Sequence, residues 1–234
     1  MRLIDRPSPN HGPRRDGAPV DMLLLHYTDM ATAEHALDRL CDPNSQVSAH
    51  YLITRDGRVF HLVPETRRAW HAGHSWWAGE GDINSRSIGV ELDNPGHSHG
   101  YTDFPEAQMT ALIALCRGIL ARHPIPPHRV LGHSDVAANR KIDPGHRFNW
   151  NRLAQAGAGV FPEAPAAVVL EEAEAVGALT RIGYRVGGAS FADPVSRIAL
   201  EAFRRHWAPE DLGQPFQPCM AAMLTVVAES NLGN

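Results

Sequence analysis

The sequence has few cysteines and no long hydrophobic run. Its three cysteines, Cys41, Cys116 and Cys219, are widely spaced and odd in number, so they form neither a zinc-binding pattern nor a convincing disulfide framework. No apolar stretch approaches the length of a transmembrane helix, and the polar N-terminus lacks the apolar segment of a signal peptide. These absences predict a cytoplasmic protein. A periplasmic protein whose export signal has been removed is the alternative.

The sequence also lacks a strong excess of charge of either sign. Its formal net charge is -4 with histidine neutral, which gives no electrostatic reason to expect a nucleic acid or an anionic membrane as partner. The 234 residues, of which 43% are hydrophobic, suffice for one large domain or for a medium domain with a small one. We expect a globular monomer. The 14 histidines are the one unusual abundance.

Strand and helix patterns interleave along the chain, which predicts an α/β fold with a mixed central sheet flanked by helices. The segment Arg55-Asp56-Gly57 between two β-rich runs predicts a hairpin. A long helix is expected to begin near Asp103, which fits a capping residue, and to end near Arg122. The other expected elements are a helix at 31–40 and strands at 20–27, 49–54, 58–63, 87–92 and 130–133.

Composition divides the chain into four parts. Residues 1–19 are polar and contain four prolines, which predicts an extended arm. Residues 20–153 hold the strand and helix patterns of a main domain, and residues 154–167 are rich in Ala, Gly and Pro, which predicts a linker. Residues 168–234 are expected to form a small module of three helices, at 168–182, 194–206 and 218–229.

Two histidines and one aspartate form the most informative constellation. His26 closes an apolar run of three leucines, His133 lies in the segment GHSD, and Asp143 lies in the segment RKIDPG. Three such ligands leave a fourth position open for water, which is the arrangement of catalytic zinc sites. A lone histidine at a strand end is more often a core residue, but His133 and Asp143 favour the metal site if a loop brings them together. The pattern predicts a zinc hydrolase.

Two charged residues fit the remaining tasks of such an enzyme. Lys141 lies two positions before Asp143, so in an extended segment both side chains project to one side, where the ammonium would stabilise an oxyanion. The alternative for Lys141 is a plain ion pair with Asp143. Glu91 lies in a hydrophobic strand pattern and fits the base that accepts a proton from water. The alternative for Glu91 is a strand residue that faces solvent.

The loop from Trp70 to Trp77 packs three tryptophans and two histidines into eight residues. Such a loop fits the wall of a groove for a sugar–peptide ligand, and a structural aromatic cluster is the alternative. His71 in this loop is a weaker candidate for metal binding than His26 or His133.

Two further polar residues fit supporting roles. His50 begins a predicted strand and fits a packing or supporting group better than a metal ligand. Asp135 fits a turn cap or a carboxylate that orients His133, because carboxylates often hold the histidines that bind metals.

Five segments, taken in order, carry a resemblance to a known family. They cover roughly residues 20–152 and are LLHYT at 24–28, VSAHYLITRDG at 47–57, AWHAG at 69–73, NSRSIGVEL at 84–92, and GHSD at 132–135 with RKIDPG at 140–145. Each is weak alone, but the set closely resembles the zinc-dependent N-acetylmuramoyl-L-alanine amidases of type 2. This family includes the AmpD-like and AmiD-like amidases and is related to the peptidoglycan recognition proteins.

The resemblance implies a zinc site and a catalytic pair. The implied zinc ligands are His26, His133 and Asp143, and the implied catalytic residues are Glu91 and Lys141. Some relatives carry a functional tyrosine where this chain has Ala49, so that variant is excluded and Glu91 gains weight. Contacts with the substrate are expected from Tyr27, His50, Trp70, His71 and Ala72.

The implied reaction is hydrolysis of the amide between N-acetylmuramic acid, or its anhydro form, and L-alanine, in the turnover or recycling of the cell wall. The segments at 179–184 and 199–206 resemble the three-helix peptidoglycan-binding module of AmiD-like amidases. Two alternatives stay open: a catalytically inactive peptidoglycan sensor, and a zinc peptidase that cuts the stem peptide. The absence of His-Glu-x-x-His argues against the commonest class of zinc peptidase.

Overall fold

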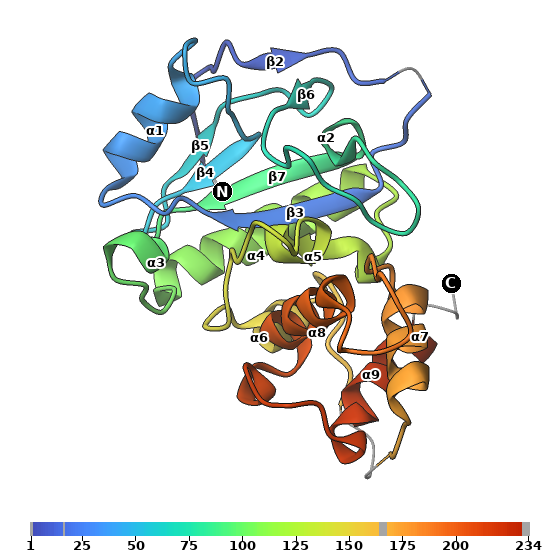
Figure 1. The fold of residues 1–234 in the computed structure, drawn as a ribbon. Helices are drawn as coiled ribbons and strands as arrows, with labels where there is room; N and C mark the ends of the chain where they lie inside the picture. The colour runs from blue at the N-terminus through green and yellow to red at the C-terminus, as the bar shows by residue number, and fades with distance from the viewer. Residues whose placement is uncertain (1, 16, 164–167, 231–234) are drawn as a thin grey trace.

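A mixed sheet forms the centre of the molecule (Figure 1). The computed structural model describes residues 2–15, 17–163 and 168–230. In this part of the chain, six strands lie in the order β1-β5-β4-β7-β3-β8, and β2 pairs with β6 in a separate two-stranded sheet. The strands are β1 (Leu3–Asp5), β2 (His11–Gly12), β3 (Met22–Tyr27), β4 (Tyr51–Ile53), β5 (Val59–His61), β6 (Arg68–Ala69), β7 (Ser87–Leu92) and β8 (Val130–Gly132).

Helices flank the sheet and follow it in the chain, so the predicted α/β fold with a mixed sheet is confirmed. The α-helices are α1 (Ala33–Cys41), α2 (Ile83–Arg86), α3 (Gly96–His99), α4 (Glu106–Arg122), α5 (His133–Val136), α6 (Trp150–Gln155), α7 (Glu172–Ile182), α8 (Pro194–Trp207) and α9 (Ala222–Ser230). Short 3-10 helices cover Pro127–Arg129, Pro209–Asp211 and Pro218–Ala221. Among the described helices, none combines the length and the apolar character that crossing a membrane requires.

The directions of the paired strands agree with the predicted hairpin and the predicted mixed sheet. β4 and β5 pair antiparallel around the predicted hairpin turn, while β1, β3, β4, β7 and β8 make parallel pairs with their other neighbours. α4 begins at Glu106 as expected, but the predicted cap is wrong: Pro105 precedes the helix without a side-chain cap, and Asp103 pairs with Arg147 instead.

Alternation along β3 divides the core between the two faces of the sheet. Leu23 and Leu25 belong to one hydrophobic cluster together with the buried side of α4. Met22 and Leu24 point to the opposite face, and His26 lies on that face too because side chains alternate along a strand. This alternation places the histidine on the side of the sheet that α4 does not cover.

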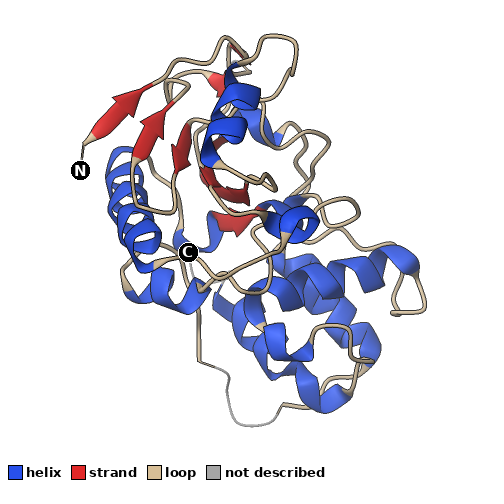
Figure 2. Ribbon diagram, turned by 90° about the vertical axis from the view of Figure 1, so that its left-hand side faces the viewer, coloured by secondary structure: helices blue, strands red, loops and turns tan. Residues whose placement is uncertain are grey.

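Two groups of helices cover this second face. α1 packs over the strands at one side of the sheet, in a cluster that includes Leu52 and Phe60. The C-terminal helices α7, α8 and α9 pack beneath β3 and β8, and their apolar side chains form one cluster with Met22, Leu24 and Trp77. Figures 1 and 2 show these helices gathered against the main domain rather than set apart from it.

The predicted arm and the predicted linker, which flank the main domain, pack into the fold more closely than the sequence suggested. Within the predicted arm at 1–19, Leu3–Asp5 forms β1 at the edge of the large sheet and His11–Gly12 forms β2 in the small one. The predicted linker at 154–167 starts inside α6, and its Ala158 is buried, while residues 164–167 lie outside the described residues. The domain boundaries themselves stay predictions.

Candidate active site

Three adjacent parallel strands bring the predicted site residues to one edge of the sheet. His26 lies at the carboxyl end of β3, Glu91 lies at the same level in β7, and His133 follows β8 directly as the first residue of α5. The carboxyl ends of parallel strands are where α/β proteins commonly build their sites, because the loops that follow them converge there. The sheet order β7-β3-β8 therefore explains how residues far apart in the sequence meet.

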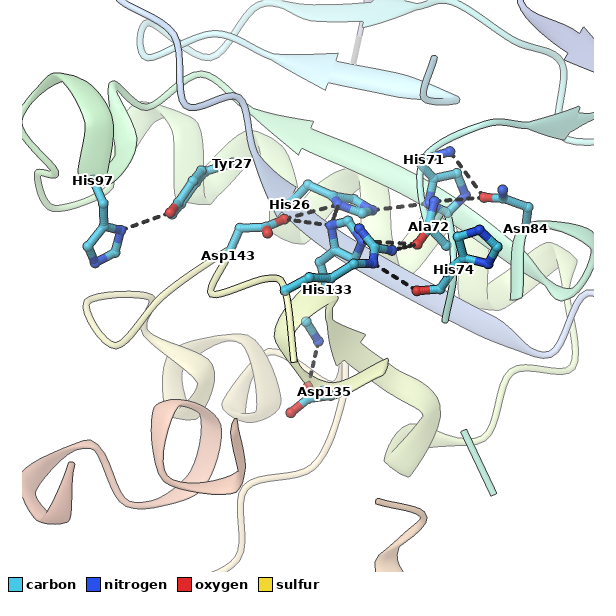
Figure 3. Close-up of polar contacts among 12 residues, drawn as sticks. His26, Tyr27, His71, Ala72, His74, Asn84, His97, His133, Asp135 and Asp143 are labelled. Carbon is cyan, nitrogen blue, oxygen red and sulfur yellow. Dashed lines mark hydrogen bonds and ion pairs between the residues drawn. The ribbon is translucent and has the colours of Figure 1, made fainter. Parts of the chain in front are cut away.

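His26, His133 and Asp143 converge at one point, as the sequence predicted (Figure 3). The Nδ1 atoms of the two histidines are 3.0 Å apart, and each lies 3.1 Å from Oδ2 of Asp143. Two ligands of one tetrahedral zinc ion lie ~3.3 Å apart at the usual zinc–ligand distances. All three residues are buried, and their donor atoms fit a single metal ion.

The outer ring nitrogens support coordination through Nδ1. Nε2 of His133 donates to the carbonyl of Ala72 at 3.2 Å, and Nε2 of His26 lies 3.0 Å from Nδ1 of His71. Nε2 of His71 in turn lies 3.3 Å from the hydroxyl of Ser87. Each Nε2 can carry its proton toward an acceptor, which leaves both Nδ1 atoms free for a metal.

Electrostatics keep His26 and Asp143 in the protonation states that metal ligands need. Burial, aided by the charge of His133, lowers the pKa of His26 to about 4, so this imidazole is neutral near pH 7. Burial alone would raise the pKa of Asp143, but the neighbouring His133 and His26 outweigh burial and lower it well below its ordinary value.

Backbone hydrogen bonds close the loop between His133 and Asp143. The amide of Ser134 donates to the carbonyl of Asp143 at 2.9 Å, and the amide of Lys141 donates to the carbonyl of Ala137 at 3.0 Å. These bonds fold the chain back on α5. The loop that the sequence required between the two ligands is therefore held at both ends.

The carboxylate of Glu91 faces the same cavity as the three ligands. Its Oε2 atom is buried and has no hydrogen-bond partner within residues 2–15, 17–163 and 168–230, which is costly for a carboxylate unless a ligand or metal-associated group completes the site. Burial, followed by the negative charge of Asp143, raises the pKa of Glu91 well above its ordinary value, and the charge of Lys141 opposes this rise. A carboxylate poised in this way can accept a proton and return it.

Lys141 also lines the cavity, beside Asp143. The nearest side-chain partners of Asp143 are the Nδ1 atoms of His26 and His133, each 3.1 Å from its Oδ2. The ion pair of Lys141 with Asp143, which was the structural alternative, is not formed in the described part of the chain. The arrangement therefore fits a lysine that is available to a ligand.

A cavity of about 350 Å³ surrounds these groups. Of the predicted substrate contacts, Tyr27, Trp70 and His71 line it. Trp77, by contrast, is buried against the C-terminal helices, so this part of the aromatic loop is structural. Other cavity-lining residues from α1, α3 and the loops include Asp29, Arg39, Val47, His97 and Arg140.

Two predicted substrate contacts do not lie on the cavity wall. His50 is fully buried, where its Nδ1 accepts from the amide of Gly89 and its Nε2 lies 3.0 Å from the carbonyl of Arg67. Burial lowers the pKa of His50 to about 3. Ala72 is fully buried too, and its carbonyl holds His133 instead of reaching the cavity. Both residues support the site from behind, so direct contact with a substrate does not fit them.

Gly89 shows how tightly this support is built. A Cβ atom at Gly89 would lie 2.5 Å from Cγ of His71. Real Cβ atoms do not approach other atoms so closely, so any larger residue would displace His71. His26 would then lose the partner of its Nε2 atom, which is His71. The glycine in the segment SIGVEL is therefore explained by the packing of the histidine.

A family model described as N-acetylmuramoyl-L-alanine amidase matches residues 16–146, which is more than half of the chain. The chain belongs to this family, Amidase_2. The resemblance inferred from the five sequence segments is thereby confirmed. Among known relatives of this amidase, AmiD of Escherichia coli is 35% identical over 212 residues, covering 81% of this chain and 75% of AmiD. The 1,6-anhydro-N-acetylmuramyl-L-alanine amidase AmpD of Enterobacter cloacae is 34% identical and covers 63% of this chain and 86% of AmpD.

Two solved structures match this amidase almost from end to end. AmiD of E. coli, in complex with the substrate anhydro-N-acetylmuramic acid-L-Ala-D-gamma-Glu-L-Lys, superposes with a TM-score of 0.78 at 33% identity, covering 94% of this chain and 91% of AmiD. AmpDh3 of Pseudomonas aeruginosa, in complex with anhydromuramic pentapeptide, gives a TM-score of 0.81 at 31% identity and covers 96% and 95% of the two chains. The likeness therefore includes the C-terminal helices.

Sequence reasoning missed several groups that shape the site. Arg140 donates to the carbonyls of Ala72 and His74, which ties the aromatic loop to the RKIDPG segment. Asn84 accepts from the amides of His71 and Ala72 (Figure 3). Both residues lie inside the quoted segments, but their roles depend on long-range contacts that no local spacing reveals.

Proposed function

We propose that this protein is a zinc-dependent hydrolase that cleaves the amide between N-acetylmuramic acid, in its ordinary or anhydro form, and L-alanine. Membership of the amidase family supports the reaction, and relatives with bound muropeptides support the substrate class. The observation that carries the proposal is Oε2 of Glu91, which has no hydrogen-bond partner among the described residues and shares one cavity with three metal-binding groups.

The donor set supports zinc as the metal. Two imidazoles and one carboxylate are ligands that zinc accepts, and three protein ligands leave an open position, which is typical of catalytic zinc sites. When bound, zinc would polarise the scissile carbonyl and lower the pKa of the attacking water. His26, His133 and Asp143 would hold it.

Glu91 carries the proton in this proposal. Its carboxylate accepts a proton from the attacking water and then delivers it to the leaving nitrogen of L-alanine, so one group acts first as base and then as acid. The raised pKa of Glu91 suits both steps better than the pKa of an exposed glutamate. A carboxyl group whose pKa lies nearer the working pH accepts a proton more readily and can still give it back.

Lys141 stabilises the negative charge that develops on the carbonyl oxygen as water adds. Tyr27, Trp70 and His71 shape the part of the cavity that receives the substrate. The resemblance of the C-terminal helices to a peptidoglycan-binding module, the cytoplasmic location and the monomeric state stay predictions. Cell fractionation and light scattering address the last two.

The test is mass spectrometry of the products from a defined anhydromuropeptide, with zinc-loaded and chelator-treated protein in parallel. Free stem peptide that begins with L-alanine, formed only with zinc, supports the proposal. Products in which L-alanine stays on the muramic acid would instead identify a peptidase. An intact muropeptide that binds but is not cleaved would identify a sensor.

A further inference from the structure

The carboxylate of Asp135 links the C-terminal helices to the metal site. Its side chain is completely buried. Oδ2 accepts from the amide of Gly132 at 2.7 Å and from Nδ1 of His206 at 2.8 Å, and Oδ1 accepts from the hydroxyl of Tyr184. His206 belongs to α8. Tyr184 follows the end of α7, with Gly183 between them. Two of the three bonds therefore come from the C-terminal helices.

The same carboxylate caps the helix that carries a metal ligand. Gly132 ends β8 and His133 begins α5, so the bond from the Gly132 amide to Asp135 fixes the turn on which His133 is mounted. The turn has little free space, because a Cβ atom at Gly132 would lie 2.7 Å from Cδ of Pro144. Pro144 directly follows the ligand Asp143. Movement of Asp135 would therefore be transmitted to two of the metal ligands, His133 and Asp143.

The two partners from the C-terminal helices are themselves rigidly held. The ring of His206 stacks between Trp150 and Trp207, with ring centroids 3.7 and 3.8 Å apart. The ring of Tyr184 packs edge-on against Trp77, at 4.9 Å between centroids. A buried carboxylate needs such fixed donors, because an unmet hydrogen bond in a dry interior is costly.

We propose that Tyr184 and His206 are positioning residues for the metal site, and that they act on His133 through Asp135. The C-terminal helices then complete the metal site of the catalytic domain, in addition to any ligand they bind themselves. The inference rests on the metal site of the proposed function. It differs from a general stabilising role because it predicts an effect on metal affinity that depends on Asp135.

The test measures the zinc dissociation constant by competition with a chromophoric chelator. Tyr184→Phe keeps the ring and removes only the hydroxyl, and His206→Gln removes the imidazole. Supporting partners of metal ligands typically contribute about 10- to 100-fold to metal affinity. Because these two residues act one step further away, we expect zinc binding about tenfold weaker in each variant.

A matched control separates positioning from loss of stability. Leu224 is buried among the same helices, and Leu224→Ala is expected to lower the thermal midpoint while leaving zinc affinity unchanged. A double-mutant cycle supplies the second readout: in the background of Asp135→Ala, which removes the acceptor, Tyr184→Phe should have no further effect on zinc affinity.

The outcomes distinguish this inference from the proposed function. Unchanged zinc affinity in both variants, or an equal loss in Leu224→Ala, would overturn the inference while leaving the amidase intact. Additive effects of Tyr184→Phe and Asp135→Ala would also overturn it. A wild-type protein that binds no zinc would overturn the metal site itself, and tight zinc binding without hydrolysis would overturn only the proposed reaction.

Discussion

Glu91 lies directly opposite His26 in the parallel pairing of β7 with β3. The two residues come from adjacent strands, and both face the cavity. The separation between the proposed base and the first metal ligand is therefore set by the pairing of two central strands, which are among the most rigid parts of a sheet protein.

Replacing Glu91 by glutamine is expected to reduce turnover strongly and to spare the metal. Removing a general base typically costs roughly 10²- to 10⁴-fold in rate, and glutamine keeps nearly the same shape. Initial rates on a defined muropeptide, with zinc content measured on the same samples, check this. Glu34→Gln, at an exposed position of α1, is the matched control and should keep full activity. Near-normal turnover of Glu91→Gln would show that another group moves the proton.

Lys141 offers a selective chemical test, because it is the only lysine in the sequence. Reagents for amines will modify only Lys141 and the N-terminus. Acetylation removes the positive charge, whereas reductive methylation keeps it. We therefore expect acetylation to lower turnover by about 100-fold, as for the loss of one oxyanion-stabilising group, and methylation to cost much less. Peptide mapping assigns the modified amine. Full activity of protein acetylated at Lys141 would contradict its role.

The pH profile should report the charges around Glu91. The pKa of Glu91 is raised by burial and by Asp143, and Lys141 opposes the rise. Because the base must be ionised to accept a proton, kcat/KM is expected to fall as the pH drops through this raised pKa. Replacing Lys141 by methionine removes the opposing charge, so the acidic limb should move to higher pH. Rates measured from pH 4 to 9 on both proteins test the shift, and a move to lower pH would reverse the assignment.

Glu65 lies outside the active-site cavity and should make the stability of the protein depend on pH. Burial alone would raise its pKa, but hydrogen bonds from Arg122, His123 and Tyr51 outweigh burial and lower the pKa to about 2. A depressed folded-state pKa stabilises the protein above the unfolded-state value of ~4.3, and this contribution is lost as the pH falls from there toward 2. Glu65→Gln should therefore be less stable than wild type at pH 7, with a difference that shrinks below pH 4.5. Urea unfolding at several pH values measures it, and a difference independent of pH would refute the assignment.

Three of the five proposed ligands and catalytic residues could be predicted from strand patterns. His26 lies near the end of an apolar strand, Glu91 lies within another, and His133 follows a third. Lys141 and Asp143 could be predicted because they share the segment RKIDPG. Strand patterns are local, and the carboxyl ends of parallel strands meet by geometry. The residues that line the cavity were predicted less well, because His50 and Ala72 lie in the same segments as cavity-lining residues but are themselves buried away from the cavity.

The long-range partners could not be predicted. Nothing local distinguishes Tyr184 or His206 from an ordinary core aromatic residue, and their bonds to Asp135 span 49 and 71 positions. The prolines and polar residues of the segment 1–19 predict an arm and conceal the short edge strand β1. Edge strands need little apolar sequence, since only part of their surface is covered.

The hydrophobic cluster shared by Met22, Leu24, Trp77 and the C-terminal helices has a consequence for how this chain can be divided. A single cut in the connection between α6 and α7 would leave two fragments that still bury one another's apolar surface, so a nicked protein should migrate as one particle. The C-terminal helices cannot simply be replaced by another module, because their apolar side chains pack directly against the main domain. A replacement would have to match the underside of the sheet, side chain by side chain.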